Sequence, residues 1–337
     1  MNASPFALHH DEHQQPFPIM KNYFTKPIII SLVILLHFGT TLQPSAHGCS
    51  ACGCSLNSDW ESQGYSTEHG FKLDLNYMFM DQAQLRSGTR KISPGDVPVG
   101  QELEDYTRNN IVTLGLSYVF NADWGVSMQL PYIIRDHATF GEDHDEYDTS
   151  STSSIGDIRL VARYQGFTAS HHFGVQLGIK LPTGSFTRTF RSGAPLDRGL
   201  QPGTGTTDLI AGVYYFDELG KDWSWFAQAT VQTAFNYRAD YKPGTAENLD
   251  AGIRYSRFKR IIPQFQINTR ISGRDVGAEA DNFDSGGTVI NLGPGVTVEV
   301  TDKIASFLFV QVPVYQNLNG YQLAPKWSLT AGIRASF

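Results

Sequence analysis

The sequence lacks the features that define several large classes of protein. Lys and Arg number 26 against 33 Asp and Glu, a formal net charge of −7, and no segment concentrates the basic residues. Because phosphate contacts require clustered Lys and Arg, nucleic-acid binding is excluded. Beyond residue 40 no run approaches the roughly 20 apolar residues of a membrane-spanning helix, so a bundle of such helices is excluded as well.

Cysteine is also scarce, whereas aromatic residues and glycine are abundant. Three cysteines in 337 residues provide no disulfide framework. Aromatic residues make up 12% of the chain and glycine occurs 32 times, a composition that favours a β-rich protein.

The N-terminal segment has the pattern of a secretory signal. A basic start at Lys21 and Lys26 leads into an apolar run over 28–36. That run is too short for a stop-transfer helix, so we expect cleavage near Ala46 and a mature chain outside the cytoplasm. We expect translation to begin at Met20, because the residues before it make a poor basic leader.

The rest of the chain alternates between apolar and polar residues. The last segment shows this most clearly, with apolar residues at Trp327, Leu329, Ala331, Ile333, Ala335 and Phe337 and polar or small ones between them. Successive side chains of a strand point to opposite faces, so this pattern predicts strands with one apolar face. The segments 71–80 and 110–120 follow the same rule.

Twelve such strands are predicted. They cover 71–80, 110–120, 124–134, 156–165, 172–182, 206–216, 223–237, 248–256, 261–273, 287–300, 304–315 and 326–337. Short connections alternate with long ones, as they do between the periplasmic turns and outer loops of a membrane barrel. Aromatic residues gather near the short connections, where an interfacial girdle belongs.

These observations predict an all-β transmembrane up-and-down antiparallel barrel of about 12 strands in the outer membrane of a Gram-negative bacterium. The barrel would cover 71–337, after a leader and cleavable signal peptide over 1–46 and a periplasmic cysteine-containing segment over 47–70. A soluble sandwich or lipocalin-like barrel also alternates, but it turns its apolar face inward. The signal peptide, the even strand number and the terminal Phe337, which resembles the signal read by the barrel assembly machinery, favour the membrane barrel.

Three short motifs carry a family resemblance. They are Ile155-Gly156-Asp157-Ile158-Arg159-Leu160-Val161-Ala162-Arg163-Tyr164, Lys180-Leu181-Pro182-Thr183-Gly184 and Pro202-Gly203-Thr204-Gly205-Thr206-Thr207-Asp208. Their residues and their order along the chain resemble those of the outer-membrane family named after the MetA pathway of phenol degradation. The resemblance implies a transporter-like barrel associated with aromatic catabolism, and it implies no catalytic residues.

The polar face of the predicted strands supplies the candidate pore-lining residues. These are Lys72, Asp74, Asp157, Arg159, Arg163, Lys180, Asp250, Arg254, Arg270, Glu299, Lys326 and Arg334. Both signs of charge occur, so we expect acid–base ladders that either fill the interior or select a small solute. Since the barrel would have about twelve strands, we expect a narrow or partly blocked channel. Prolines within the expected strands predict bulges or irregular pairing at Pro131, Pro182, Pro263, Pro294 and Pro313.

A second candidate site follows the predicted cleavage point. His47, Cys49, Cys52 and Cys54 form a compact set of ligands suited to a soft metal such as Cu(I) or Zn²⁺. A disulfide between Cys49 and Cys52 is an equal alternative in the oxidising periplasm. Lipidation of Cys49 is a third alternative, although the expected Leu three residues earlier is absent.

Catalysis and cation binding find little support. No nucleophile motif or phosphate-binding glycine loop occurs, and only Asp136-His137, at the rim of an expected strand, resembles part of a hydrolase site. The acidic loops 136–148 and 274–286 match no known calcium-loop spacing, and we interpret both as solvated outer loops. We therefore predict that the protein is not an enzyme and has no cofactor apart from the metal alternative above.

The function predicted first is a channel that lets small solutes, aromatic or hydrophobic ones among them, cross the outer membrane. Its expected partners are membrane lipid, the barrel assembly machinery and the solute. Two alternatives remain, namely a metal- or redox-linked barrel that uses the cysteine cluster and a structural or adhesive barrel whose loops are the functional surface.

Overall fold

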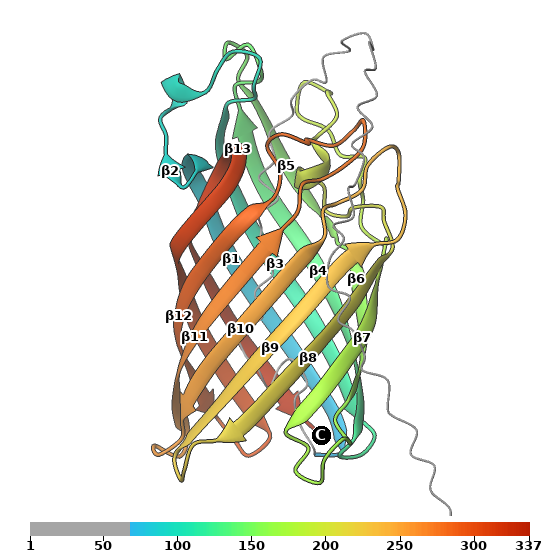
Figure 1. Cartoon of the computed structure of the whole chain (residues 1–337), viewed down its shortest axis with the longest axis vertical. Helices are drawn as coiled ribbons and strands as arrows, with labels where there is room; N and C mark the ends of the chain where they lie inside the picture. Colours follow the sequence, from blue (N-terminus) through green and yellow to red (C-terminus); the bar gives the residue numbers. More distant parts are fainter. Residues whose placement is uncertain (1–67) are drawn as a thin grey trace, which may run out of the picture. The chain divides into compact units, whose positions relative to one another are not determined.

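The computed structural model describes residues 68–337 (Figure 1). The predicted signal peptide and the cluster of His47, Cys49, Cys52 and Cys54 lie outside the described residues. Residues 68–337 form thirteen strands and two one-turn 3₁₀ helices, η1 (Pro94–Asp96) and η2 (Arg198–Leu200). Within this range no helix is long and apolar enough to cross a membrane.

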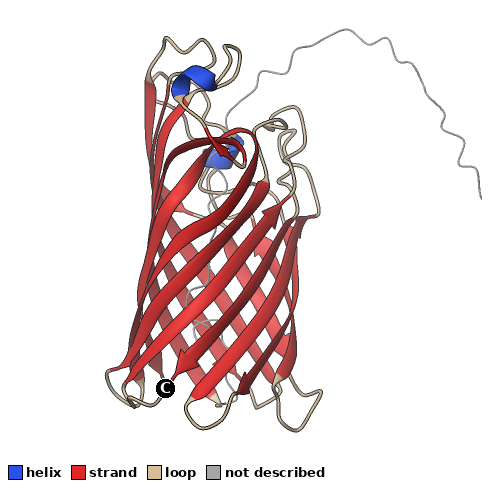
Figure 2. Cartoon of the chain, turned by 60° about the vertical axis from the view of Figure 1, so that its left-hand side comes forward, coloured by secondary structure: helices blue, strands red, loops and turns tan. Residues whose placement is uncertain are grey.

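The strands follow one another along the chain with short turns at one end and longer loops at the other (Figure 2). They are β1 (Gly70–Gly88), β2 (Arg90–Lys91), β3 (Glu104–Val119), β4 (Trp124–Thr139), β5 (Asp148–Ile155), β6 (Ile158–Tyr164), β7 (Phe173–Leu181), β8 (Asp208–Glu218), β9 (Trp223–Ala234), β10 (Ala246–Tyr255), β11 (Ile261–Ser272), β12 (Gly287–Glu299) and β13 (Ile304–Ser336).

The strands close into an antiparallel barrel. Successive wall strands pair with one another, the short β2 pairs only with β1, and β1 also pairs with β3 and β13. Strand β13 crosses the wall twice, because its first part pairs with β12 and its second with β1, with a turn near Gly320 at φ +56°. Strands β5 and β6 pair with successive parts of β4 and act as one wall strand. Residues 68–337 thus cross the wall twelve times, which confirms the predicted all-β barrel.

On the outer side the strands are longer than predicted. The segments 81–88, 104–109 and 135–139 were expected in loops but continue β1, β3 and β4. Beyond the bilayer a strand needs no apolar face, and β5 shows this with the sequence DTSSTSSI. The ladder persists there because backbone hydrogen bonds do not depend on side-chain polarity. The alternation pattern therefore detects the part of each strand that faces lipid and misses its polar extension.

The prolines within strands coincide with a change of strand register at two places. The register between β12 and β13 shifts between Pro313 and Tyr315, and Gly156 and Asp157 separate β5 from β6 opposite Pro131. These two predicted irregularities are confirmed. At Pro263 the pairing of β11 with β12 keeps its register, so the predicted irregularity is wrong there. At Pro294 no bulge forms, but the pairing of β12 with β13 is interrupted at Gly293 and Pro294, which confirms irregular pairing there. Pro182 lies just beyond the end of β7.

The barrel exposes its apolar residues and buries its charged ones. Leu75 and Leu177 are 47% and 60% exposed on the outer face, whereas Asp74 and Lys180 are 2% and 3% exposed. A soluble barrel would show the reverse. An exposed apolar band on a closed wall is the arrangement of a barrel that spans a bilayer, since closure leaves no unpaired edge in hydrocarbon. The soluble alternative is thereby excluded.

Aromatic side chains form a girdle at the end with short turns. Neighbouring rings contact one another in series, in the pairs Phe71–Tyr118, Tyr118–Phe120, Trp124–Tyr164, Tyr164–Phe167, Phe167–Phe173, Tyr215–Trp225, Trp223–Tyr255 and Tyr255–Phe258. Such a belt marks the interface between hydrocarbon and water, as predicted.

Aromatic side chains also lie inside the barrel towards the short turns. Phe226 and Phe309 are buried, and each ring packs over a glycine of a neighbouring strand. A Cβ atom at Gly252 would lie 2.5 Å from the Phe226 ring, and one at Gly295 would lie 2.1 Å from the Phe309 ring. These glycines leave room for the rings, so this half of the lumen is narrowed by side chains.

Candidate functional site: the lumen network and its cavity

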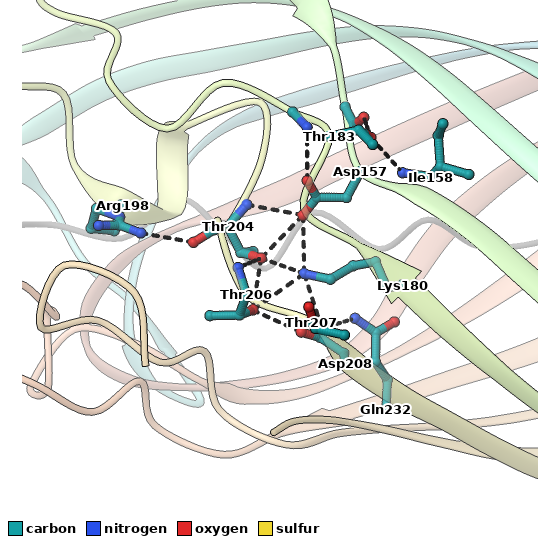
Figure 3. Close-up of polar contacts among 12 residues, drawn as sticks. Asp157, Ile158, Lys180, Thr183, Arg198, Thr204, Thr206, Thr207, Asp208 and Gln232 are labelled. Carbon is teal, nitrogen blue, oxygen red and sulfur yellow. Dashed lines mark hydrogen bonds and ion pairs between the residues drawn. The ribbon is translucent and has the colours of Figure 1, made fainter. Parts of the chain in front are cut away.

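A buried ion-pair network stands at the centre of the site (Figure 3). The Lys180 ammonium on β7 lies 3.0 Å from Asp157 Oδ2 and 3.0 Å from Asp208 Oδ2. It also donates to the hydroxyls of Thr204 and Thr206. The three ionic side chains are at most 8% exposed. One cation thus holds two carboxylates, which leaves the trio with a net negative charge.

The network joins the barrel wall to the loop between β7 and β8. Asp157 lies in the interruption between β5 and β6, and its carboxylate accepts hydrogen bonds from the backbone of Gly184 and Thr204, each at 3.0 Å. Gly184 and Gly203 pack backbone to backbone, since a Cβ at Gly184 would come within 2.7 Å of Gly203 Cα. Glycine is needed at both positions for this approach. Asp157 therefore anchors both ends of the loop.

The three motifs of the family resemblance meet at this network. Asp157 comes from the first motif, Lys180 and Gly184 from the second, and Thr204 and Asp208 from the third. The residues that carry the resemblance thus form one structural unit, which holds an outer loop to the inside of the wall.

A cavity of about 290 Å³ adjoins the network. Its wall combines charged, polar and apolar side chains from the strands with residues of three outer loops, 182–207, 235–245 and 273–286. Among its lining residues are Met78, Ile111, Ile133, Arg135, Arg159, Lys180, Arg198, Asp208, Arg270 and Asp275.

The three loops are linked by one chain of contacts. Arg198 of η2 donates to the Thr204 carbonyl at 2.7 Å and lies over the Tyr241 ring, 4.6 Å from its centroid. The Tyr241 hydroxyl in turn donates to Asp275 Oδ2 at 2.8 Å. On the wall, the Arg135 guanidinium donates to the Gly199 carbonyl at 3.2 Å. The loops therefore roof the cavity as one connected layer.

The twelve predicted pore-lining residues occupy different environments. Eight are buried, namely Lys72, Asp74, Asp157, Arg163, Lys180, Asp250, Arg254 and Arg334. Arg159 and Arg270 line the cavity, together with Asp157 and Lys180. Glu299, the last residue of β12, and Lys326, at a register shift of β13 against β1, are exposed. Asp74 pairs with Arg334 across β1 and β13, the arrangement expected of an acid–base ladder.

Sequence reasoning missed five residues of the site: Arg135, Arg198, Thr204, Asp208 and Gln232. Asp208 and Thr204 belong to the third motif, which was recognised, but their partner could not be named without the register that sets Lys180 opposite Asp208. Gln232, which donates to Asp208 Oδ2 at 2.6 Å, depends in turn on the pairing of β8 with β9. Arg135 was placed in a loop because β4 was ended too early.

The side chains of the Asp136-His137 pair are not brought together in the structure. The two residues are neighbours within β4, so their side chains point to opposite faces. His137 is fully buried and its Nδ1 lies 2.8 Å from the Thr107 hydroxyl. The sequence placed His137 at the rim of an expected strand, whereas it lies within β4. Within residues 68–337 no group of three or more His, Cys, Asp or Glu is arranged to hold a metal ion.

Three carboxyls of the loop 273–286, those of Asp275, Asp281 and Asp284, are buried rather than solvated, contrary to the sequence interpretation. Burial, reinforced by the neighbouring Asp284, raises the pKa of Asp281 to about 8. Burial likewise raises the pKa of Asp284 to about 7, although its hydrogen bond from the Tyr321 amide opposes this. Burial also raises the pKa of Asp197, and Glu102 adds to the effect. The outer loops therefore contain acids that favour their neutral form.

Comparisons with known proteins agree with this fold. The sequence profile of the family described as "Putative MetA-pathway of phenol degradation" matches residues 81–322, which is more than half of the chain. No curated protein matches the sequence significantly.

Two solved structures illustrate the similarity. The COG4313 outer membrane channel from Pseudomonas putida F1 has a TM-score of 0.61 at 14% identity, covering 81% of this chain and 97% of that chain. The β domain of the Bordetella autotransporter BrkA has a TM-score of 0.48 at 14% identity, covering 80% and 100%. At these identities the first likeness establishes a barrel of the outer-membrane type.

Proposed function

This chain belongs to the family described as "Putative MetA-pathway of phenol degradation", and we propose that it is a non-enzymatic outer-membrane channel for small, partly apolar solutes. The observation that carries the proposal is the cavity of about 290 Å³ inside a closed, lipid-facing barrel. A barrel that served only as an anchor would gain stability by filling this space with side chains.

The lining of the cavity supports a solute of mixed polarity. Met78, Ile111 and Ile133 provide an apolar surface, and charged side chains stand on the same cavity wall. Ligand sites commonly combine apolar walls with a few placed polar groups. The loop 182–207 roofs this space through Arg198 and Gly199, so we infer that it controls entry from the outer side.

Two experiments test the channel. Conductance of the purified protein in planar bilayers and swelling of proteoliposomes in small sugars and alcohols should both report permeation. Absence of conductance together with absence of swelling would reject the proposal and favour a structural or adhesive barrel.

A loop variant tests where the passage is narrowed. The Gly203 amide donates to the Ser185 carbonyl at 2.8 Å, so residues 186–201 leave and return at adjacent points. Replacing 186–201 by two glycines should raise the conductance, because Arg198, Gly199 and Gln201 leave the cavity wall while the Lys180 network stays. The matched control replaces only the exposed Arg191 and Ser192 by glycine. Equal conductance of all three proteins would contradict a constricting role for this loop.

The remaining predictions concern assembly and metal binding. Phe337 directly follows the last wall strand, and we propose that it serves as the signal for the barrel assembly machinery. Binding of Cu(I) or Zn²⁺ by His47, Cys49, Cys52 and Cys54 stays a separate proposal. Native mass spectrometry of the mature protein tests it, since an intact disulfide without bound metal would remove it.

A further inference from the structure

Positive charge is in excess around the cavity. Its lining includes five cationic side chains, Arg135, Arg159, Lys180, Arg198 and Arg270, and three carboxylates, Asp157, Asp208 and Asp275. Lys180 is shared between Asp157 and Asp208, so the four arginines face the net single negative charge of that trio and the charge of Asp275. Two positive charges are therefore not balanced by the carboxylates of the wall.

Two of these arginines also keep an unused donor. The Nε–H groups of Arg198 and Arg270 are buried and have no hydrogen-bond partner within residues 68–337. Other nitrogens of the two side chains are engaged. Arg198 Nη1 and Nη2 donate to the Ala239 and Thr204 carbonyls, and Arg270 Nη1 donates to Asn248 Oδ1 at 3.2 Å. A buried donor without an acceptor is unfavourable, and an anion is the acceptor that a guanidinium binds most strongly.

The arginines are also held close to like charge. Arg270 lies near enough to Arg159 for the two positive charges to repel each other. Asp275 attracts Arg270 from the loop side, but its carboxylate is already engaged by the Tyr241 hydroxyl and the Gly244 amide, each at 2.8 Å. An anion between the guanidinium groups would relieve this repulsion.

Part of the cavity wall is apolar and suits a solute with an apolar body. Met78, Ile111, Pro131 and Ile133 line the same cavity. An apolar cavity of roughly 150 Å³ is enough to hold benzene. The space of about 290 Å³ therefore accommodates a body of one ring or a short alkyl chain together with a charged head group.

We propose that the cavity is a binding site for a small organic monoanion with an apolar body, a monocarboxylate being the simplest case. Arg198 and Arg270 would hold the carboxylate, and Ile111 and Ile133 would contact the body. This inference rests on the proposed channel and names the class of solute that it favours. Because the guanidinium groups bind the charge and the apolar side chains bind the body, the channel would prefer such an anion over a neutral molecule of the same shape.

Three probes of nearly equal shape test the site in planar bilayers with potassium chloride. Benzoate should reduce the chloride current in a concentration-dependent way, whereas neutral benzamide and cationic benzylammonium should not. The double variant R198Q/R270Q should weaken the block by benzoate at least about tenfold. The matched control R257Q changes an arginine in a short turn whose side chain is 69% exposed, and it should leave the block unchanged.

Isothermal titration of the detergent-solubilised protein with benzoate measures binding independently of conduction. A channel that conducts but binds the three probes equally would overturn the inference and leave the proposed function standing. A protein that binds benzoate through the two arginines without conducting would retain the site and reject the channel. A site that binds chloride but not benzoate would also overturn the inference, as would unchanged benzoate binding in R198Q/R270Q. If that variant does not fold, R270K keeps the charge without the Nε donor and should still bind benzoate more weakly.

Discussion

At the scale of single residues, Lys180 shows how the interior tolerates buried charge. Its ammonium contacts two carboxylates and two hydroxyls, so none of the three ionic side chains is buried without a partner. Such an arrangement adds little net stability compared with an apolar core, but removing one partner is strongly unfavourable. The two aspartates would then repel each other inside the barrel.

The substitution Lys180→Met should therefore destabilise the protein by about 3–5 kcal/mol, because Asp157 and Asp208 lose their shared cation. Urea unfolding of the protein in micelles, followed by tryptophan fluorescence, measures the change. Lys221→Met in an exposed short turn is the control and should stay within about 0.5 kcal/mol of the parent. Equal stability of both variants would show that the network does not hold the loop.

The same residues show how far the site was predictable. Lys180 and Asp157 were assigned to the interior from strand alternation alone. Their contact with each other was not predictable, since Asp157 reaches Lys180 from the break between β5 and β6. The position of such an irregularity depends on how three strands pair, and no local pattern encodes it.

At the scale of elements, the outer loops behave as a packed layer rather than as solvated connections. Asp284 accepts a hydrogen bond from the Tyr321 amide at 2.6 Å, and Asp281 accepts one from the Asp284 amide at 2.7 Å. Both carboxyls are buried, which ties the loop 273–286 to the turn of β13. An acidic loop in a sequence suggests solvation, and only the neighbouring loops determine whether water reaches it.

This packing should depend on pH. The folded-state pKa values of about 8 for Asp281 and about 7 for Asp284 lie above the usual value near 4, so the folded loop binds more protons than the unfolded loop between these limits. Stability of the loop is thus greatest at low pH and falls as pH rises towards 8. For each proton that is released when the loop opens, the equilibrium constant for opening rises about tenfold per pH unit.

Hydrogen exchange of the Asp284 and Tyr321 amides at pH 5 and pH 8 measures this effect as a protection factor. The factors should be larger at pH 5. The variant D281N/D284N keeps an acceptor oxygen at each position but cannot ionise, so its factors should change little with pH. A parent protein whose protection rises with pH would contradict the buried, neutral state of these acids.

At the scale of the whole molecule, the barrel presents its apolar side to the surroundings. The exposed band and the aromatic girdle define the depth of each outward residue in the bilayer. Leu249 on β10 lies six residues from the end of its strand and is 46% exposed, whereas Phe258 lies in the short turn that follows and is 60% exposed.

Arginine substitutions at these two positions should have different effects. Leu249→Arg should destabilise the protein by about 2–4 kcal/mol, since the charge is placed near the middle of the hydrocarbon. Phe258→Arg, the matched control near the interface, should have an effect of about 0–1 kcal/mol. Reversible unfolding from lipid vesicles gives both values. Equal effects would place the membrane band elsewhere on the barrel.

The amino-acid sequence by itself determined the class of fold, the number of wall strands and which face of each strand meets lipid. It could do so because the alternation of apolar and polar residues in a strand is a local property, and because apolar side chains face lipid whereas polar ones face the interior. Only the tertiary structure decided the register of the strands, their extensions on the outer side, the position of the loop 182–207 and the arginine-lined cavity. These features depend on contacts between residues far apart in the chain, such as Arg198 with Tyr241 and Lys180 with Asp157, which pairing across the barrel brings together.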